Sequence, residues 1–193
     1  MRLIAHTQQS APAVQSGQVT VDLSAISDNI RALKKRSRAP FFMAVVKGNG
    51  YGHGLVEGAR TAVQAGADWL GTAQLAEAVT LRRAGVTAPI LSWLYLASQT
   101  SEAINEALEN DVDLSLGSVS QLEVLAGAAR RLGRPGVVHL ELDSGLSRGG
   151  ARMEDWAGLV ARARQAELDS TLRVRGIWIP LAWADVPAHP GNA

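Results

Sequence analysis

The chain has 193 residues, 47% of them hydrophobic and 19% charged, a composition typical of a globular protein with one substantial core. Its formal net charge of +1 gives no electrostatic reason to expect a nucleic acid or an anionic membrane as partner. The absence of cysteine excludes disulfides and thiolate metal sites and is compatible with a cytoplasmic protein. Residues 1–18 lack the apolar core of a signal peptide and are predicted to form a flexible tail. The most apolar later stretch, residues 89–97, is too short to span a bilayer.

From residue 19 onward, short apolar runs alternate with longer amphipathic segments. The first helix is expected over residues 24–36, where Ile26, Ile30 and Leu33 recur on one face. Further helices are expected between the apolar runs, three of them followed closely by a glycine that can cap the end. These helices are predicted at residues 55–65, 75–84, 101–109, 119–132 and 154–165.

The apolar runs are the expected strands, at residues 42–47, 69–71, 90–93, 112–116, 137–143 and 174–178. Strands that are apolar throughout and alternate with helices predict a parallel sheet covered by helices. The spacing suits either an open doubly wound sheet or a (β/α)8 barrel. A complete barrel takes about 250 residues, so six units would make an incomplete one.

The first strand ends in Lys47 and runs into a loop, residues 48–54, that carries Asn49, Tyr51, His53 and four glycines. A lysine at a partly desolvated strand end has its ammonium form disfavoured, which makes it a better nucleophile toward a carbonyl. The alternative is an ordinary surface lysine. The glycines favour a site, because they indicate close backbone approach or unusual dihedral angles.

The stretch 47–54, Lys-Gly-Asn-Gly-Tyr-Gly-His-Gly, resembles the pyridoxal-phosphate lysine motif of bacterial alanine racemases. Residues 21–30, 139–150 and 175–192 resemble further segments of that family, in the same order. The likeness covers residues 19–193. It implies an α/β fold, an alanine-racemase-type (β/α)8 TIM barrel reduced here to about six βα units, with the family's C-terminal β-domain missing. Residues 19–193 would then be the N-terminal part of the pyridoxal-phosphate-binding barrel domain.

The resemblance also implies an activity and roles for particular residues. The family interconverts L-alanine and D-alanine through a pyridoxal 5'-phosphate aldimine, supplies D-alanine for peptidoglycan, and works as a cytoplasmic homodimer. Lys47 would be the cofactor lysine and a catalytic acid/base group. Tyr51 would lie near the cofactor phosphate, and Arg148 near the ring oxygen and the substrate carboxylate. Asn49 and His53 are expected to structure the loop.

Simpler interpretations of two of these residues remain open. Tyr51 could be a loop aromatic that packs on the barrel rim. Arg148 could form a surface ion pair with Glu141 or Glu154. Asp143 is expected to orient the loop that precedes Arg148, and no set of residues has the short regular spacing of metal ligands.

The chain departs from the family pattern in three places. Glu141 stands where the family often has a carbamylated lysine that steadies the arginine, and a glutamate supplies a negative charge directly. Pro180 stands where the family usually has a histidine facing the cofactor ring. The family's second base is a tyrosine from the C-terminal domain of the dimer partner, and the tyrosines here are Tyr51 and Tyr95. Activity of the isolated chain is therefore expected to be severely impaired, and a non-catalytic cofactor-binding homologue or degenerate fragment is the alternative.

Overall fold

Parallel strands form a single sheet in which each strand pairs with the next one along the chain, in the order β1-β2-β3-β4-β5-β6. The computed structural model describes residues 19–95, 101–186 and 188–192, so the predicted tail lies outside the described residues. The strands are β1 Met43–Val45, β2 Trp69–Thr72, β3 Ile90–Ser92, β4 Asp113–Leu116, β5 Gly136–Glu141 and β6 Leu172–Trp178. Every predicted strand is present, with bounds that shift by a few residues.

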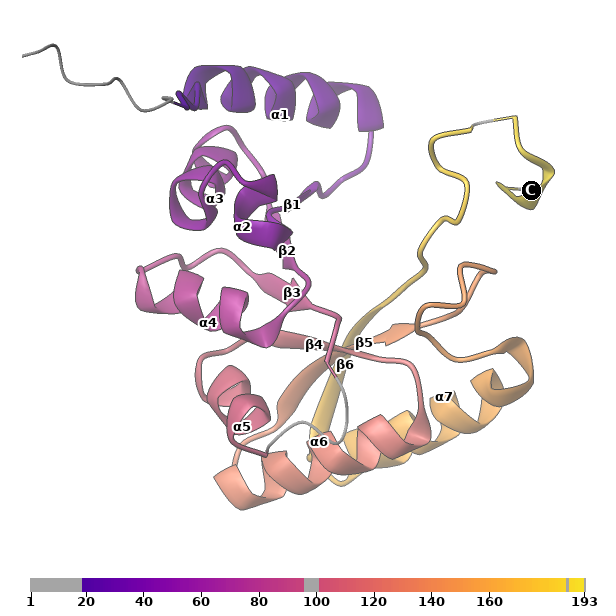
Figure 1. Ribbon diagram of the computed structural model, residues 1–193. Coiled ribbons are helices and arrows are strands. Elements are labelled where there is room, and N and C mark those ends of the chain that lie inside the picture. The colour runs from indigo at the N-terminus through magenta and orange to yellow at the C-terminus, as the bar shows by residue number, and fades with distance from the viewer. Residues whose placement is uncertain (1–18, 96–100, 187, 193) are drawn as a thin grey trace, which may run out of the picture.

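The predicted helices are confirmed and cover the outer side of the sheet. They are α1 Leu23–Ser37, α3 Leu55–Gln64, α4 Leu75–Arg83, α5 Ser101–Glu109, α6 Val119–Leu132 and α7 Met153–Leu168. In Figure 1 they follow one another in an arc from α1, in indigo, to α7, in orange. A short 3-10 helix, η1 (Pro190–Asn192), lies near the C-terminus. None of the described helices is both long and apolar enough to cross a membrane.

The helix ends follow local side-chain chemistry. Asp22 begins α1 by accepting hydrogen bonds from the backbone N–H groups of Ser24 and Ala25, which satisfies donors that have no partner inside the helix. Ser118 begins α6 in the same way, and Gly133 ends it in the left-handed conformation.

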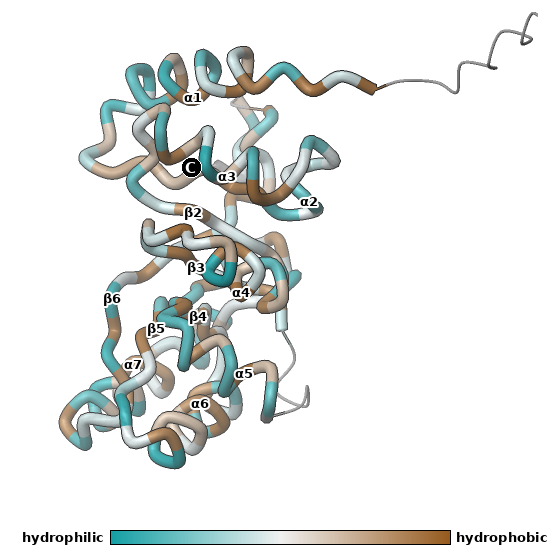
Figure 2. The backbone as a smooth tube through the Cα atoms, turned by 90° about the vertical axis from the view of Figure 1, so that its left-hand side faces the viewer, coloured by the Kyte–Doolittle hydropathy of each residue, from teal (hydrophilic) through white to brown (hydrophobic). Residues whose placement is uncertain are grey.

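The core lies between the sheet and the helices. In Figure 2 the helices alternate between hydrophilic and hydrophobic colours along their length, as expected for elements with one buried face. The fully buried side chains from the sheet include Leu70, Ile90, Leu114 and Val138, and those from the helices include Leu81, Ile104, Leu122, Leu125 and Leu159.

The sheet is strongly curled. In a flat sheet β2 and β6 would lie about 19 Å apart. Here the Arg175 guanidinium, on β6, is 5.4 Å from the ring centroid of Trp69, on β2. The His139 ring, on β5, also meets Trp69, with centroids 5.4 Å apart. The sequence is compatible with an open doubly wound sheet or a (β/α)8 barrel. The curvature shows that the sheet is part of a barrel, which is incomplete with six strands over the described residues.

One predicted boundary is wrong in a way that affects the site. The first strand was expected to include Lys47, but β1 ends at Val45 and Lys47 opens the short element α2 (Lys47–Tyr51). The next three residues, Gly48, Asn49 and Gly50, have left-handed dihedral angles, with φ of 61°, 56° and 63°. An extended strand cannot continue through such angles.

Candidate active site

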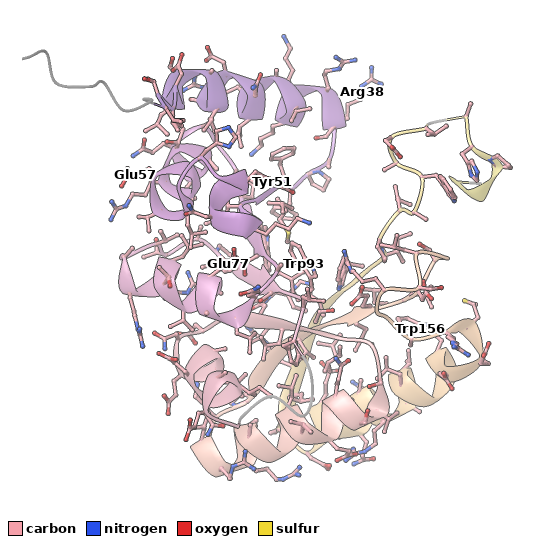
Figure 3. The ribbon with its side chains drawn as sticks, in the orientation of Figure 1. Arg38, Tyr51, Glu57, Glu77, Trp93 and Trp156 are labelled. Atoms are coloured by element: carbon pink, nitrogen blue, oxygen red, sulfur yellow. The ribbon has the colours of Figure 1, made fainter. Side chains whose placement is uncertain are left out.

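The carboxyl ends of all the strands meet at one edge of the curled sheet, where barrel enzymes carry their catalytic groups. Lys47 follows β1 and Trp93 follows β3, while Glu141 and Trp178 end β5 and β6. Figure 3 labels Tyr51, Glu77 and Trp93, which come from this end of the first three βα units. The sequence-predicted residues Lys47 and Arg148 therefore both lie at this edge.

The α2 turn that carries Lys47 is stabilised by its own backbone and by Asn49. The N–H groups of Gly50 and Gly54 donate to the carbonyls of Val46 and Asn49, at 2.8 and 2.9 Å. The Asn49 side-chain oxygen accepts a hydrogen bond of 2.9 Å from the Leu55 N–H at the start of α3. The expectation that Asn49 structures the loop is thereby confirmed. His53 Nδ1 lies 2.9 Å from the Gly50 carbonyl and also contacts the turn.

Within this turn, Lys47 and Tyr51 lie on the same side. The Lys47 Nζ atom is 5.8 Å from the Tyr51 ring centroid, a distance that suits a weak cation–π contact. Lys47 is half-buried, whereas Tyr51 is 62% exposed. Tyr51 therefore lies at the surface of the turn, and its role as a cofactor contact or as a rim aromatic stays a prediction.

Glu77, on α4, also contacts the α2 turn and was not predicted from the sequence. One carboxylate oxygen accepts hydrogen bonds from the N–H groups of Gly48, at 2.6 Å, and Asn49, at 3.3 Å. The other accepts from the Gln74 N–H, at 3.2 Å, as part of the capping box that begins α4. The glutamate three residues after Gln74 is the sequence signal of that box, but the pattern does not reveal the second contact.

Glu141 lies at the centre of a buried polar network. Its Oε2 accepts a hydrogen bond of 3.0 Å from the Ser115 hydroxyl, and the Ser115 oxygen accepts one of 3.0 Å from the Trp178 indole N–H. Its Oε1 has no hydrogen-bond partner among the described residues and lies 3.9 Å from an Arg148 nitrogen. Burial raises the pKa of the Glu141 carboxyl, and the Ser115 hydrogen bond and the Arg148 charge oppose the rise.

The loop before Arg148 is organised by Asp143, as the sequence predicted. Its carboxylate accepts hydrogen bonds from the N–H of Ser147, at 2.9 Å, and of Gly145, at 3.0 Å. These bonds lower the pKa of Asp143. Of the two ion-pair partners considered for Arg148, the structure shows Glu141.

Pro180 and two tryptophans form the remaining part of this edge. The Pro180 carbonyl accepts a hydrogen bond from the Ser144 hydroxyl, and its buried ring offers no donor. The rings of Trp93 and Trp178 lie 5.9 Å apart between centroids. Where the resemblance would place a histidine, the chain has a buried proline that supplies no side-chain donor.

The other titratable groups of interest lie away from Lys47. His139 points to the concave side of the sheet and pairs with Asp113 at 3.0 Å, and His189 stacks on Trp183. Among the residues that the structure describes, no group of three or more His, Asp or Glu side chains is arranged to hold a metal ion.

Comparison with known proteins gives a consistent result. Residues 21–193 match the family model "Alanine racemase, N-terminal domain". The alanine racemase of Salinispora arenicola is 48% identical over 173 residues, which cover 90% of this chain and 45% of that protein. The alanine racemase of Streptomyces coelicolor is 42% identical over 191 residues, 96% of this chain and 48% of that protein.

Solved structures show the same similarity in three dimensions. The crystal structure of alanine racemase from D-cycloserine-producing Streptomyces lavendulae superposes with a TM-score of 0.84 at 43% identity, covering 89% of this chain and 44% of that one. The chain thus spans a little less than half the length of the relatives it matches.

Proposed function

The chain belongs to the alanine racemase N-terminal domain family, and on that premise we propose that it forms the barrel portion of a pyridoxal-phosphate-dependent enzyme that interconverts L- and D-alanine. The observation that carries the proposal is the half-buried Lys47, held by a left-handed turn at the carboxyl edge of the sheet. In this proposal the protein works in the cytoplasm, as a homodimer, and supplies D-alanine for peptidoglycan.

The side chains present at this edge fit pyridoxal phosphate in their chemistry. Lys47 offers the amine that joins the cofactor carbonyl carbon. Tyr51 offers a hydroxyl for the phosphate. Arg148, whose only ion pair among the described residues is the 3.9 Å contact with Glu141, has donors left for the ring oxygen. When bound, the cofactor would act as an electron sink that makes the α-proton of an amino acid removable.

The chain's own residues would bind the substrate and move its proton. The Lys47 amine would serve one face of alanine: it would remove the α-proton from that face in one direction of the reaction and deliver a proton to it in the reverse direction. The Arg148 guanidinium would hold the substrate carboxylate region, since a guanidinium is always charged and donates in a fork. The negative charge of Glu141 would keep Arg148 facing the site.

Racemisation also needs an acid/base group on the opposite face. The Tyr95 hydroxyl cannot serve, because it is buried and donates to the Ser115 carbonyl at 2.6 Å. Tyr51 shares the turn of Lys47 and lies on the same side. We therefore assign the second group to the dimer partner, and its loss would cost about 10²- to 10⁴-fold in rate.

The second candidate is a protein that binds pyridoxal phosphate without racemising alanine. Pro180 favours it, because the site then lacks a side-chain donor beside the cofactor ring. Lys47 and Tyr51 would keep their binding roles in this case, and D-alanine would not be formed.

The test is to add pyridoxal phosphate, reduce with borohydride and measure the intact mass. Lysine occurs only at positions 34, 35 and 47, so a peptide map assigns any adduct without ambiguity. We expect one adduct at Lys47 that is absent in Lys47→Ala, while Lys35→Ala leaves it unchanged. D-alanine formation then separates the racemase from the binding protein. A wild-type chain with no adduct at Lys47 would refute both.

A further inference from the structure

We propose that Glu77 is the positioning residue for Lys47: its carboxylate holds the two peptide groups that follow the lysine and so directs the amine into the site. The inference deepens the proposed function and rests on it for its catalytic meaning. Its structural basis is that one Glu77 oxygen accepts hydrogen bonds from the N–H groups of both Gly48 and Asn49.

The α2 turn needs an external anchor. Asn49 and Tyr51 both have positive φ, 56° and 55°, and a side chain in the left-handed region costs about 1 kcal/mol or more. A helical turn also leaves its first N–H groups without partners. The bonds within the turn engage the N–H groups of Gly50, Gly52, His53 and Gly54, whereas those of Gly48 and Asn49 are satisfied by Glu77.

Glu77 is suited to hold the Gly48 and Asn49 N–H groups because its own position on α4 is fixed. It lies in the first turn of α4, beside Leu75, Ala78 and Val79, which are 5%, 0% and 4% exposed. A capping box uses a single glutamate oxygen, here bonded to the Gln74 N–H. The second oxygen is therefore free to reach the neighbouring βα unit, and a carboxylate bonds N–H groups about twice as strongly as a neutral acceptor.

The chain offers a matched control. Glu57 occupies the same position in α3, three residues after the N-cap Gly54, as Glu77 occupies in α4 after Gln74. Its carboxylate pairs with Arg60 at 3.3 Å on the surface. Glu57→Ala therefore removes a first-turn carboxylate without affecting the α2 turn. Figure 3 labels both glutamates.

The experiment compares the full chain with Glu77→Ala, Glu77→Gln and Glu57→Ala by two readouts that need no cofactor. The first is amide hydrogen exchange at Gly48 and Asn49. The second is the rate of reductive methylation by formaldehyde and borohydride, resolved by peptide mapping. Lys35 serves as the exposed reference. Lys34, whose ammonium pairs with Asp68 at 2.8 Å, reports whether the fold is intact.

In Glu77→Ala we expect exchange at the two amides to rise at least about ten-fold, and the Lys47 methylation rate to change while that of Lys34 stays constant. Trapping of pyridoxal phosphate at Lys47 should fall by about ten- to a hundred-fold, as for a misplaced catalytic group. Glu77→Gln should be intermediate, because its amide oxygen can still accept from Gly48. Glu57→Ala should match the wild type.

Three results would overturn the inference. One is unchanged amide exchange and Lys47 reactivity in Glu77→Ala, and another is a parallel rise in methylation at Lys34 and Lys47 that reflects general loosening. Normal trapping in Glu77→Ala would overturn it as well. If the wild-type chain traps no pyridoxal phosphate, the proposed function fails, and the exchange and methylation readouts still decide whether Glu77 directs Lys47.

Discussion

The polar side chains at the two ends of the curled sheet differ in how completely they are hydrogen-bonded. Toward the amino end, Asp113 accepts two bonds from Arg175, at 2.9 and 3.2 Å, and pairs with His139 as well. Arg82 donates to four backbone carbonyls. At the carboxyl end, the hydroxyl of buried Thr72 and one oxygen of buried Glu141 have no hydrogen-bond partner among the described residues.

This difference separates residues that hold the fold from residues available for chemistry. A charged side chain that makes all its hydrogen bonds within the protein is costly to remove. It has few donors or acceptors free to bind a ligand. A polar group left without a partner lowers stability, and such groups persist in proteins chiefly at functional sites. We therefore expect mutations at the amino end to change stability and those at the carboxyl end to change mainly binding.

The largest expected effect is that of Asp113→Ala. The change leaves the Arg175 guanidinium and the His139 ring without their common partner inside the sheet. Breaking a buried ion pair in this way costs about 3–5 kcal/mol of unfolding free energy. Denaturant unfolding would measure it, with the exposed Asp28→Ala, expected to change stability by less than about 0.5 kcal/mol, as the control. A loss below about 1 kcal/mol would show that the Asp113 cluster does not hold the strands together.

The next effect is that of Arg82→Met, which keeps the apolar stem and removes the donors. The carbonyls of Val86, Ala88, Asn110 and Asp111 lose their partner, and we expect a loss of about 2–4 kcal/mol. Arg83→Met is the matched control, since that neighbouring side chain is 70% exposed and pairs with Glu106 on the surface. Equal losses in the two variants would contradict the structural role of Arg82.

The smallest expected change in unfolding free energy is a gain in stability, and it comes from a substitution of Glu141 at the carboxyl end of the sheet. Burial raises the folded-state pKa of Glu141 above its unfolded value. The group therefore stabilises the fold fully at acid pH, below its unfolded pKa, and that stabilisation is lost as pH rises through the folded pKa. Glu141→Gln should be more stable than the wild type by about 1 kcal/mol at pH 8, and the difference should shrink on acidification.

Glu141→Gln should also weaken trapping of pyridoxal phosphate, because Arg148 loses its negative partner. Unfolding curves between pH 4 and pH 8, with surface Glu123→Gln as the control, would test the stability part. Two results would contradict this prediction: a Glu141→Gln variant that is less stable than the wild type at pH 8, or a difference in unfolding free energy that is the same at every pH. Either result would show that burial of the Glu141 charge does not lower the stability of the fold.

Much of this fold could be predicted from the sequence because apolar periodicity and glycine caps act locally. The segment of residues 119–132 shows both signals, and α6 has those bounds. Lys47 was recognised from its loop composition, but the left-handed turn was not, since glycines permit such angles without requiring them. Glu77 was missed because its contact with Gly48 crosses 29 positions and depends on how two βα units lie side by side. The position of Glu141 beside Ser115 likewise depends on the pairing of β4 with β5.

The left-handed turn also determines which positions can tolerate substitution. A Cβ built on Gly48 would meet no atom within 4 Å, and one on Gly50 would meet only the Leu55 backbone, at 3.7 Å or more. Space does not require glycine at either position, and an alanine or asparagine would cost only about 1–2 kcal/mol of dihedral strain. Natural variants could therefore lose both glycines and keep the turn. One Glu77 oxygen accepts from the Gly48 and Asn49 N–H groups and the other from the Gln74 N–H. Because no other side chain at position 77 reproduces all three bonds, sequence drift should be most restricted there, outside the glycine-rich motif itself.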